Sequence, residues 1–199
     1  MRYHYLVMER EYGSGGTQIS ERLSQELGIP CYGRQILETV ANKYHVPIEQ
    51  LDHYEEKATN SFLYSVYLMS RMDTGQANLA SAETSIYLEE QKVIHDYAAA
   101  GPGIFIGHCA AQAFKDRKDV LRVFIHAEHD FRIKRAISEY GIPQTEAERV
   151  LKKFDKKRAN YYKANTSVEW KEFNEYDLIL NSGKMGIDGC VELLKKWME

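Results

Sequence analysis

Hydrophobic residues gather along this chain in short continuous runs and in helical stripes, and the two patterns alternate. The first run, Tyr3–Met8, leads into a glycine-rich segment, after which Ile19, Leu23 and Leu27 recur every four residues. That spacing places the three side chains on one face of a helix. Gly28 follows at the position where glycine commonly ends a helix. The chain is therefore predicted to open with a strand, a glycine loop and a helix.

The same alternation continues to the C-terminus. Further apolar runs predict strands at residues 29–33, 103–107, 120–127 and 176–182. Amphipathic stretches separate these runs, and the longest of them predicts a basic helix that starts near Thr145. Strands that alternate with helices predict a parallel sheet covered on both faces. We therefore expect an α/β fold.

Residues 47–100 read almost wholly as helix, which is more than one crossover connection needs. We interpret this stretch as an inserted helical subdomain. It carries an apolar stripe at Phe62, Val66 and Met69 that fits either a helical core or a face of a homodimer. Both interpretations of the stripe stay open.

Composition narrows the class of protein. The 199 residues suit one domain of ordinary size, and 44% hydrophobic with 28% charged residues allows a buried core and a charged surface. A net charge of −3 argues against a general nucleic-acid binder. No apolar stretch approaches the ~20 residues of a membrane span, and the N-terminal residues lack the apolar segment of a signal peptide.

The three cysteines, Cys31, Cys109 and Cys190, are too sparse for a disulfide framework or a zinc site. Sparse, unpaired cysteines are typical of a reducing compartment. We therefore expect a soluble cytoplasmic protein that uses neither a membrane nor nucleic acid as a partner.

The glycine-rich segment MEREYGSGGTQIS, residues 8–20, has the context of a phosphate-binding loop. The usual motif is G-x-x-x-x-G-K-[ST], whose lysine reaches the terminal phosphates, but here Gly16 stands in place of the lysine. Glycines let successive backbone N–H groups turn toward one anion, and the following helix adds its positive end. Phosphate contacts are expected from Gly13, Ser14, Gly15, Gly16, Thr17 and Gln18, with Thr17 also helping to hold Mg²⁺. A strand-to-helix turn without a ligand is the alternative.

Ligands of a parallel sheet bind outside the carboxyl ends of its strands. Arg10 ends the first strand at the mouth of the glycine loop and is a candidate to supply the charge that the missing lysine does not, or else it forms a surface pair with Glu11 that flanks the turn. His108 ends a later strand, where it either contacts a ligand or merely closes the strand. Cys109 has no His and Asn companions, so we expect a small buried cysteine and not a nucleophile.

Two further candidates lie on the long basic helix. Asp155 and Arg158 are about one helical turn apart. An arginine on a helical lid can close over phosphates, and a carboxylate can hold it in position. A solvated helix face is the alternative for such a charge cluster.

Five segments taken together resemble the cytidylate kinase-like family: EREYGSGGTQIS, IPCYGRQILE, FIGHCAAQAF, DKKRANYY and YDLILNS. The resemblance implies a P-loop fold of the nucleoside-monophosphate-kinase type with a five-stranded parallel sheet flanked by helices. Its core would comprise about residues 1–33, 101–137 and 175–199. A helical monophosphate-binding insert would occupy about 34–100, and a helical lid about 138–174.

The resemblance also implies roles for particular residues. Arg34 falls near the arginine that contacts the acceptor phosphate, and His108 falls in a segment on the acceptor side, where a basic residue is expected. Asn181 and Ser182 resemble the turn beside the donor base. Arg158, oriented by Asp155, would stabilise the transferring group.

The function implied is phosphoryl transfer from ATP, with Mg²⁺, to a small phosphorylated acceptor such as a nucleoside monophosphate. Small-molecule nucleotides would then be the partners. A kinase of a different small acceptor and a non-catalytic nucleotide sensor are the alternatives within this fold. A structural helical interaction module is a third alternative, and it would bind no nucleotide.

Overall fold

The computed structural model describes residues 2–45 and 82–199. The predicted stripe at Phe62, Val66 and Met69 lies outside the described residues. The elements in chain order are β1 (Tyr5–Arg10), α1 (Gly16–Leu27), β2 (Cys31–Tyr32), α2 (Arg34–Lys43), α5 (Ala82–Ala100), β3 (Gly103–Ile106), α6 (Ala110–Ala113), β4 (Val120–His126), α7 (His129–Ser138), α8 (Gln144–Thr166), a 3₁₀ turn η1 (Phe173–Glu175), β5 (Leu178–Asn181) and α9 (Ser182–Met198).

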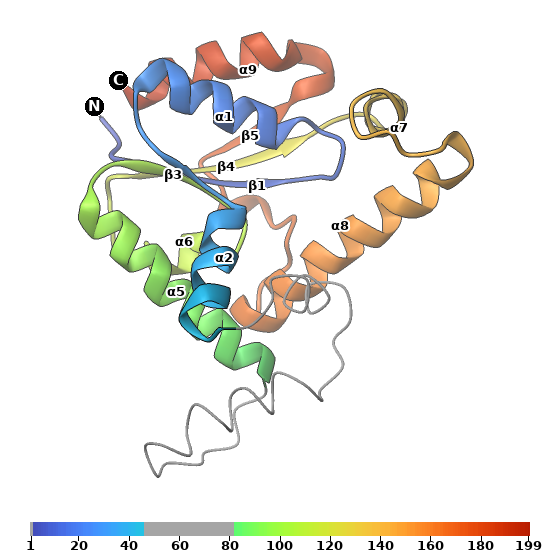
Figure 1. Ribbon diagram of the computed structural model, residues 1–199. Coiled ribbons are helices and arrows are strands. Elements are labelled where there is room, and N and C mark those ends of the chain that lie inside the picture. The colour runs from blue at the N-terminus through green and yellow to red at the C-terminus, as the bar shows by residue number, and fades with distance from the viewer. Residues whose placement is uncertain (1, 46–81) are drawn as a thin grey trace.

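Five parallel strands form one sheet in the order β2-β3-β1-β4-β5 (Figure 1). The strand β1 is central, and Tyr5 is in register with Gly103 of β3 on one side and with Val120 of β4 on the other. A parallel sheet requires a crossover between neighbouring strands, which the helices supply. The parallel five-stranded sheet is thus confirmed.

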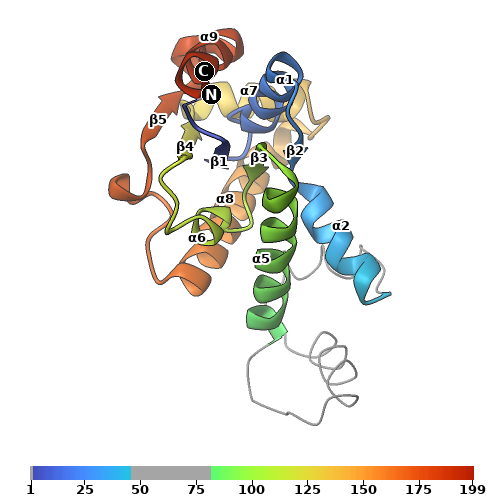
Figure 2. The ribbon, with the colours of Figure 1, turned by 90° about the vertical axis from the view of Figure 1, so that its left-hand side faces the viewer.

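Helices cover both faces of the sheet (Figures 1 and 2). On one face α1 and α9 pack over Leu6 and Met8 of β1, and on the other α2, α5 and α6 pack over Tyr5 and Val7. Successive residues of β1 thus enter opposite halves of the core, as the period of a strand dictates. Because both halves are apolar, β1 reads in the sequence as a continuous hydrophobic run.

Capping residues fix the end of α1 and the start of α9. Gly28 adopts a left-handed conformation and its N–H bonds to the carbonyl of Ser24, so the predicted end of the first helix is confirmed. The last strand, predicted at 176–182, spans Leu178–Asn181, and it ends at Asn181 because this residue caps α9: its side chain accepts hydrogen bonds from the N–H groups of Gly183 and Lys184.

The helix α8 follows α7 and runs back past the carboxyl end of β1 (Figure 1). Near its start Ala147 and Leu151 pack in an apolar cluster with Tyr12, and near its end Tyr162 packs with Trp170. Apolar contacts at both ends therefore hold α8 across the edge of the sheet where ligands of parallel sheets bind.

The predicted lid, 138–174, contains α8, and the predicted insert, 34–100, is bounded by α2 and α5. The middle of that insert, 46–81, lies outside the described residues. Within the described parts of the chain, no helix is long and apolar enough to cross a membrane.

Candidate functional site

The loop between β1 and α1 is a tight turn that is stabilised by the side chain of one of its residues, Ser14. Ser14 is fully buried, and its hydroxyl donates a 2.8 Å hydrogen bond to the carbonyl of Glu11. Gly13 has a positive φ of 78°, and a Cβ added there would lie 2.7 Å from the carbonyl oxygen of Arg132. Only glycine fits this position, both for its conformation and for the space available. The backbone N–H of Ser14 also lies 3.2 Å from the carbonyl of Glu11, so both the hydroxyl and the N–H of Ser14 stabilise the turn, and its contact with a phosphate remains a prediction.

Ser182, the first residue of α9, contacts the same loop. Its hydroxyl lies 2.5 Å from the carbonyl oxygen of Ser14 and 3.1 Å from that of His126, and the residue is fully buried. The hydroxyl of Ser182 faces these carbonyls, and the neighbouring Asn181 caps α9 with its amide group 3.3 Å from Glu128. That this turn lies beside a donor base remains a prediction for both residues.

The first turn of α1 presents open backbone donors. No side chain caps the helix at Gly15, and the side chains of Thr17 and Gln18 are exposed. The first N–H groups of a helix have no partner within it and carry partial positive charge. Gln18 accepts a 2.9 Å hydrogen bond from Arg135, whose Nε is buried without a hydrogen-bond partner. The start of α1 thus has backbone N–H groups next to the cationic side chain of Arg135.

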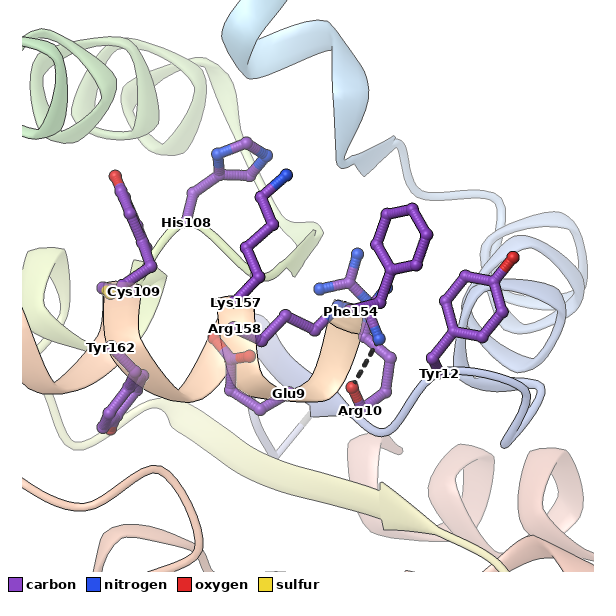
Figure 3. A pocket seen from close by; sticks show the side chains of 11 residues that line it. Glu9, Arg10, Tyr12, His108, Cys109, Phe154, Lys157, Arg158 and Tyr162 are labelled. Atoms are coloured by element: carbon purple, nitrogen blue, oxygen red, sulfur yellow. Dashed lines mark hydrogen bonds between the residues drawn. The ribbon is translucent and has the colours of Figure 1, made fainter. Parts of the chain in front are cut away.

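A cavity of about 140 Å³ adjoins the loop at the carboxyl ends of β1 and β3, with α8 along its side (Figure 3). It is lined by Glu9, Arg10, Tyr12, Gly107, His108, Cys109, Phe154, Lys157, Arg158, Tyr161 and Tyr162. The basic side chains of this lining come from β1, from the segment after β3 and from α8, and Figure 3 shows Lys157 extending toward the ring of His108. Such an excess of basic groups suits an anionic ligand.

Glu9 is the carboxylate of this lining. It is buried and accepts a 2.9 Å hydrogen bond from the indole N–H of Trp170. Cys109 is buried as predicted, and burial raises the pKa of its thiol, with Glu9 and Glu90 adding to the rise. The thiol therefore stays protonated at neutral pH and lacks nucleophilic character.

Asp155 and Arg158 both reach the loop, but through different partners. The carboxylate of Asp155 accepts a 2.7 Å hydrogen bond from the Tyr12 N–H and pairs with Arg132 at 2.5 Å. Arg158 donates a 2.8 Å hydrogen bond to the carbonyl of Arg10 (dashed in Figure 3). The prediction that Asp155 orients Arg158 is therefore wrong: the carboxylate instead meets a loop N–H and a second guanidinium, which together compensate its charge.

His108 contacts the helix α5, an element that the sequence did not predict to be part of the site. Its Nδ1 lies 2.9 Å from a carboxylate oxygen of the buried Glu90, and its carbonyl accepts a 3.0 Å hydrogen bond from Gln91. The hydroxyl of Tyr161 in α8 donates to the other Glu90 oxygen. His108 itself has a φ of 57°, a strained conformation that the surrounding contacts must maintain. Glu90 thus joins α5, the segment after β3 and α8.

A signal for Glu90 exists in the sequence. It interrupts the stripe of Ile86, Val93 and Ile94 on the inward face of α5, where an acidic residue needs a buried partner. Arg34, by contrast, lies at the start of α2, 60% exposed and 3.1 Å from Glu38. The described lining of the cavity does not include it. Its contact with the acceptor remains a prediction.

Comparison with known proteins finds similarity over nearly the whole chain. The model of the cytidylate kinase-like family matches residues 7–184. A cytidylate kinase from Archaeoglobus fulgidus is 24% identical over 191 residues, which cover 94% of this chain and 90% of that protein.

Two solved structures share the fold. An uncharacterized protein from Eubacterium ventriosum superposes with a TM-score of 0.71 at 21% identity, covering 98% of this chain and 97% of that one. A shikimate kinase from Bacteroides thetaiotaomicron superposes with a TM-score of 0.54 at 15% identity, with coverage of 98% and 97%. The predicted fold, a P-loop-type parallel sheet flanked by helices, is confirmed.

Proposed function

Because the chain belongs to the cytidylate kinase-like family, we propose that it is a kinase that transfers the terminal phosphoryl group of ATP to a small phosphorylated acceptor. A nucleoside monophosphate is the acceptor class proposed, with cytidylate first, since the matched curated relative is a cytidylate kinase. A reaction between two phosphorylated substrates needs two anion sites side by side, within reach of one another.

The observation that carries this proposal is the basic cavity next to the glycine loop. The loop and the start of α1 offer backbone donors for one chain of phosphates. The cavity beside it is lined by Arg10, His108, Lys157 and Arg158, which suits a second phosphate. Both lie at the carboxyl edge of the sheet, and Arg158 bonds to the carbonyl of Arg10 where the strand β1 turns into the loop.

The residues present fit ATP and Mg²⁺. The buried Nε atoms of Arg10 and Arg135 have no hydrogen-bond partner, and phosphate oxygens would satisfy such donors. Thr17 offers an exposed hydroxyl in the first turn of α1, and Mg²⁺ is commonly held by few protein oxygens together with phosphates and water. Bound there, the ion would supply charge neutralisation to the phosphate oxygens.

The chain's own residues would act by position and charge, since phosphoryl transfer requires little covalent work by the protein. The amides of Gly13 and of Gly15 to Gln18 would hold the donor phosphates, while the Ser14 N–H bonds to the carbonyl of Glu11. Arg10 and Arg158 face the charge that develops on the transferring group, while His108, Lys157 and the predicted Arg34 bind the acceptor. The helix α8 excludes water, which disfavours ATP hydrolysis. Each ~1.4 kcal/mol of stabilisation in the transition state is a factor of ten in rate.

A non-catalytic nucleotide sensor is the second candidate, and the glycine at position 16 favours it, because the lysine missing there contacts terminal phosphates in the usual loop. A sensor would keep the loop and use binding only to shift conformation or assembly. It would bind ATP and turn over no acceptor.

A coupled assay separates the two candidates. Purified protein is supplied with ATP and Mg²⁺ and with each common nucleoside monophosphate in turn, and nucleoside diphosphate formation is followed. The kinase predicts turnover on at least one acceptor well above the rate without acceptor. Tight ATP binding, measured by calorimetry, with no turnover on any acceptor contradicts the kinase and supports the sensor.

A further inference from the structure

Two glycines that are 91 positions apart in the sequence lie against one arginine side chain. A Cβ added at Gly16 would lie 2.6 Å from the Cβ of Arg10 and 2.9 Å from its Cγ. A Cβ added at Gly107 would lie 2.5 Å from Nη1 of the same arginine. Arg10 therefore leaves the end of β1, passes over the first residue of α1 and ends against the turn after β3.

The two glycines are required for different reasons. Gly107 has a positive φ of 73°, so its backbone favours glycine in any case. Gly16 is the first residue of α1 and has no positive φ, so an ordinary side chain would suit its backbone. The obstacle at Gly16 is the root of the Arg10 side chain, which cannot swing away as the end of a long side chain can. The Cβ and Cγ of Arg10 thus occupy the space that a side chain at position 16 would need.

The guanidinium of Arg10 has the environment of an anion-binding group. Among the described residues no carboxylate pairs with it, and its Nε is buried without a hydrogen-bond partner. It lines the cavity together with Gly107 and His108, while its backbone carbonyl is held by Arg158. A partly buried cation without a carboxylate partner is unfavourable unless an anionic ligand compensates it.

We propose that Arg10 replaces the phosphate-loop lysine, reaching the terminal phosphates from β1 instead of from α1, and that Gly16 and Gly107 make the space for its side chain. This inference rests on the proposed function for the identity of the ligand, but its steric part concerns the protein alone. Arginine at position 10 and any side chain at position 16 exclude one another. Arg10 lines the cavity, and its side chain passes the first residue of α1, so its planar set of donors, which lysine lacks, could contact both the donor and the acceptor phosphate.

The steric part is tested without any nucleotide, by urea unfolding. Gly16→Ala should lower the unfolding midpoint, although alanine ordinarily stabilises a helix. Combined with Arg10→Gly, which removes the clashing side chain, Gly16→Ala should lose most of that effect. Gly189→Ala is the matched control, because its nearest neighbour, Met185 Cβ, lies at an ordinary 3.6 Å. The steric part is overturned if Gly16→Ala does not lower the unfolding midpoint, or if it lowers the midpoint by the same amount when residue 10 is glycine.

The ligand part is tested by calorimetry with Mg-ATP. Arg10→Gly should weaken binding at least tenfold, and Gly16→Lys should weaken it further still in the presence of Arg10. The double variant Arg10→Gly with Gly16→Lys restores the usual loop and should bind more tightly than either single variant. The proposal that Arg10 replaces the lysine is overturned if Gly16→Lys alone binds Mg-ATP with wild-type affinity. It is also overturned if the double variant binds Mg-ATP no more tightly than the single variants. Wild-type protein that binds no Mg-ATP would count against the proposed function, and the urea experiment would still decide the steric part.

Discussion

The carboxylate of Asp155 accepts a hydrogen bond from the backbone N–H of Tyr12, with 2.7 Å between the oxygen and the nitrogen. One atom pair thus joins the helix α8 to the loop that turns from β1 into α1. The other oxygen of Asp155 pairs with Arg132 from α7, so three elements meet at one carboxylate. Loop conformation and the position of α8 are therefore expected to depend on each other.

Replacing Asp155 with asparagine should destabilise the protein and weaken nucleotide binding together. The amide keeps the shape but removes the carboxylate nearest to Arg132, which is 11% exposed and keeps only the longer contact with Glu11 at 3.5 Å. Loss of one partner from a hydrogen-bonded charge pair of this burial costs about 2 kcal/mol. Urea unfolding and Mg-ATP calorimetry measure the two effects. The control is Glu148→Gln on the exposed side of α8, which should change neither, and equal behaviour of the two variants would contradict the assigned role of Asp155.

Arg158→Ala should lower turnover more than it lowers ATP affinity. The guanidinium lines the cavity and bonds to the Arg10 carbonyl, and in the proposed mechanism it faces the charge that develops during transfer. Removing one preorganised donor of this kind costs on the order of 100-fold in turnover. Steady-state kinetics with the best acceptor, alongside ATP calorimetry, measure the ratio.

The matched control for Arg158 is Lys163→Ala on the same helix, where the lysine pairs with Glu169 at the surface. Its kinetics should match those of the wild type. If Arg158→Ala weakened ATP binding strongly and left turnover intact, the arginine would be a simple binding contact.

Glu90→Gln should weaken acceptor binding and lower stability, because the buried carboxylate serves both His108 and Tyr161. The expected cost is about 2 kcal/mol in the free energy of unfolding. Tyr161→Phe removes the hydroxyl that α8 contributes to Glu90, should cost about 1 kcal/mol, and should leave the acceptor KM closer to the wild-type value. Urea unfolding and the acceptor KM of both variants measure this difference. An acceptor KM that rises equally in the two variants would contradict a specific link from Glu90 to His108.

The contact between Arg117 and Asp119 predicts a pH dependence of stability. Hydrogen bonds from Arg117, at 2.7 and 2.9 Å, and a contact with His4 hold the pKa of Asp119 at about 2, below its ordinary 3.8. A lowered carboxyl pKa stabilises the folded protein above pH 3.8 and loses that effect as the pH falls toward about 2. Because Arg117 and His4 are 47% and 54% exposed, the effect is about 1 kcal/mol.

Asp119→Asn tests this by urea unfolding at a series of pH values. The variant should be less stable than the wild type near neutrality, and the difference should vanish as the pH approaches 2. A difference that stays constant down to that pH would contradict the assignment to Asp119.

The sequence was sufficient for features that depend on neighbours along the chain. The run before the loop, the glycines, the helical stripe to Leu27 and the terminating Gly28 predicted the opening of the fold correctly. Alternation of strands and helices predicted the parallel sheet, because a parallel pair needs a crossover. These regularities are local or follow from topology alone.

The errors and omissions arise from contacts between distant segments. Asp155 meets Tyr12 and Arg132 because of how α8 crosses the strand ends, which helix periodicity does not specify. Ser182 is directed toward the loop because α9 begins directly at the end of β5. The route of the Arg10 side chain past Gly16 could not be predicted either, because the missing lysine does not indicate which residue takes its place.

Transfer of label from the terminal phosphate of ATP tests the central claim most directly. Protein is mixed with Mg²⁺, ATP labelled at the terminal phosphate and a nucleoside monophosphate, cytidylate first, and the products are separated. We predict label in the nucleoside diphosphate and far less in inorganic phosphate, with transfer reduced on the order of 100-fold in Arg158→Ala. Label that stays in ATP, or passes only to inorganic phosphate with every nucleoside monophosphate tried, would contradict phosphoryl transfer to this class of acceptor.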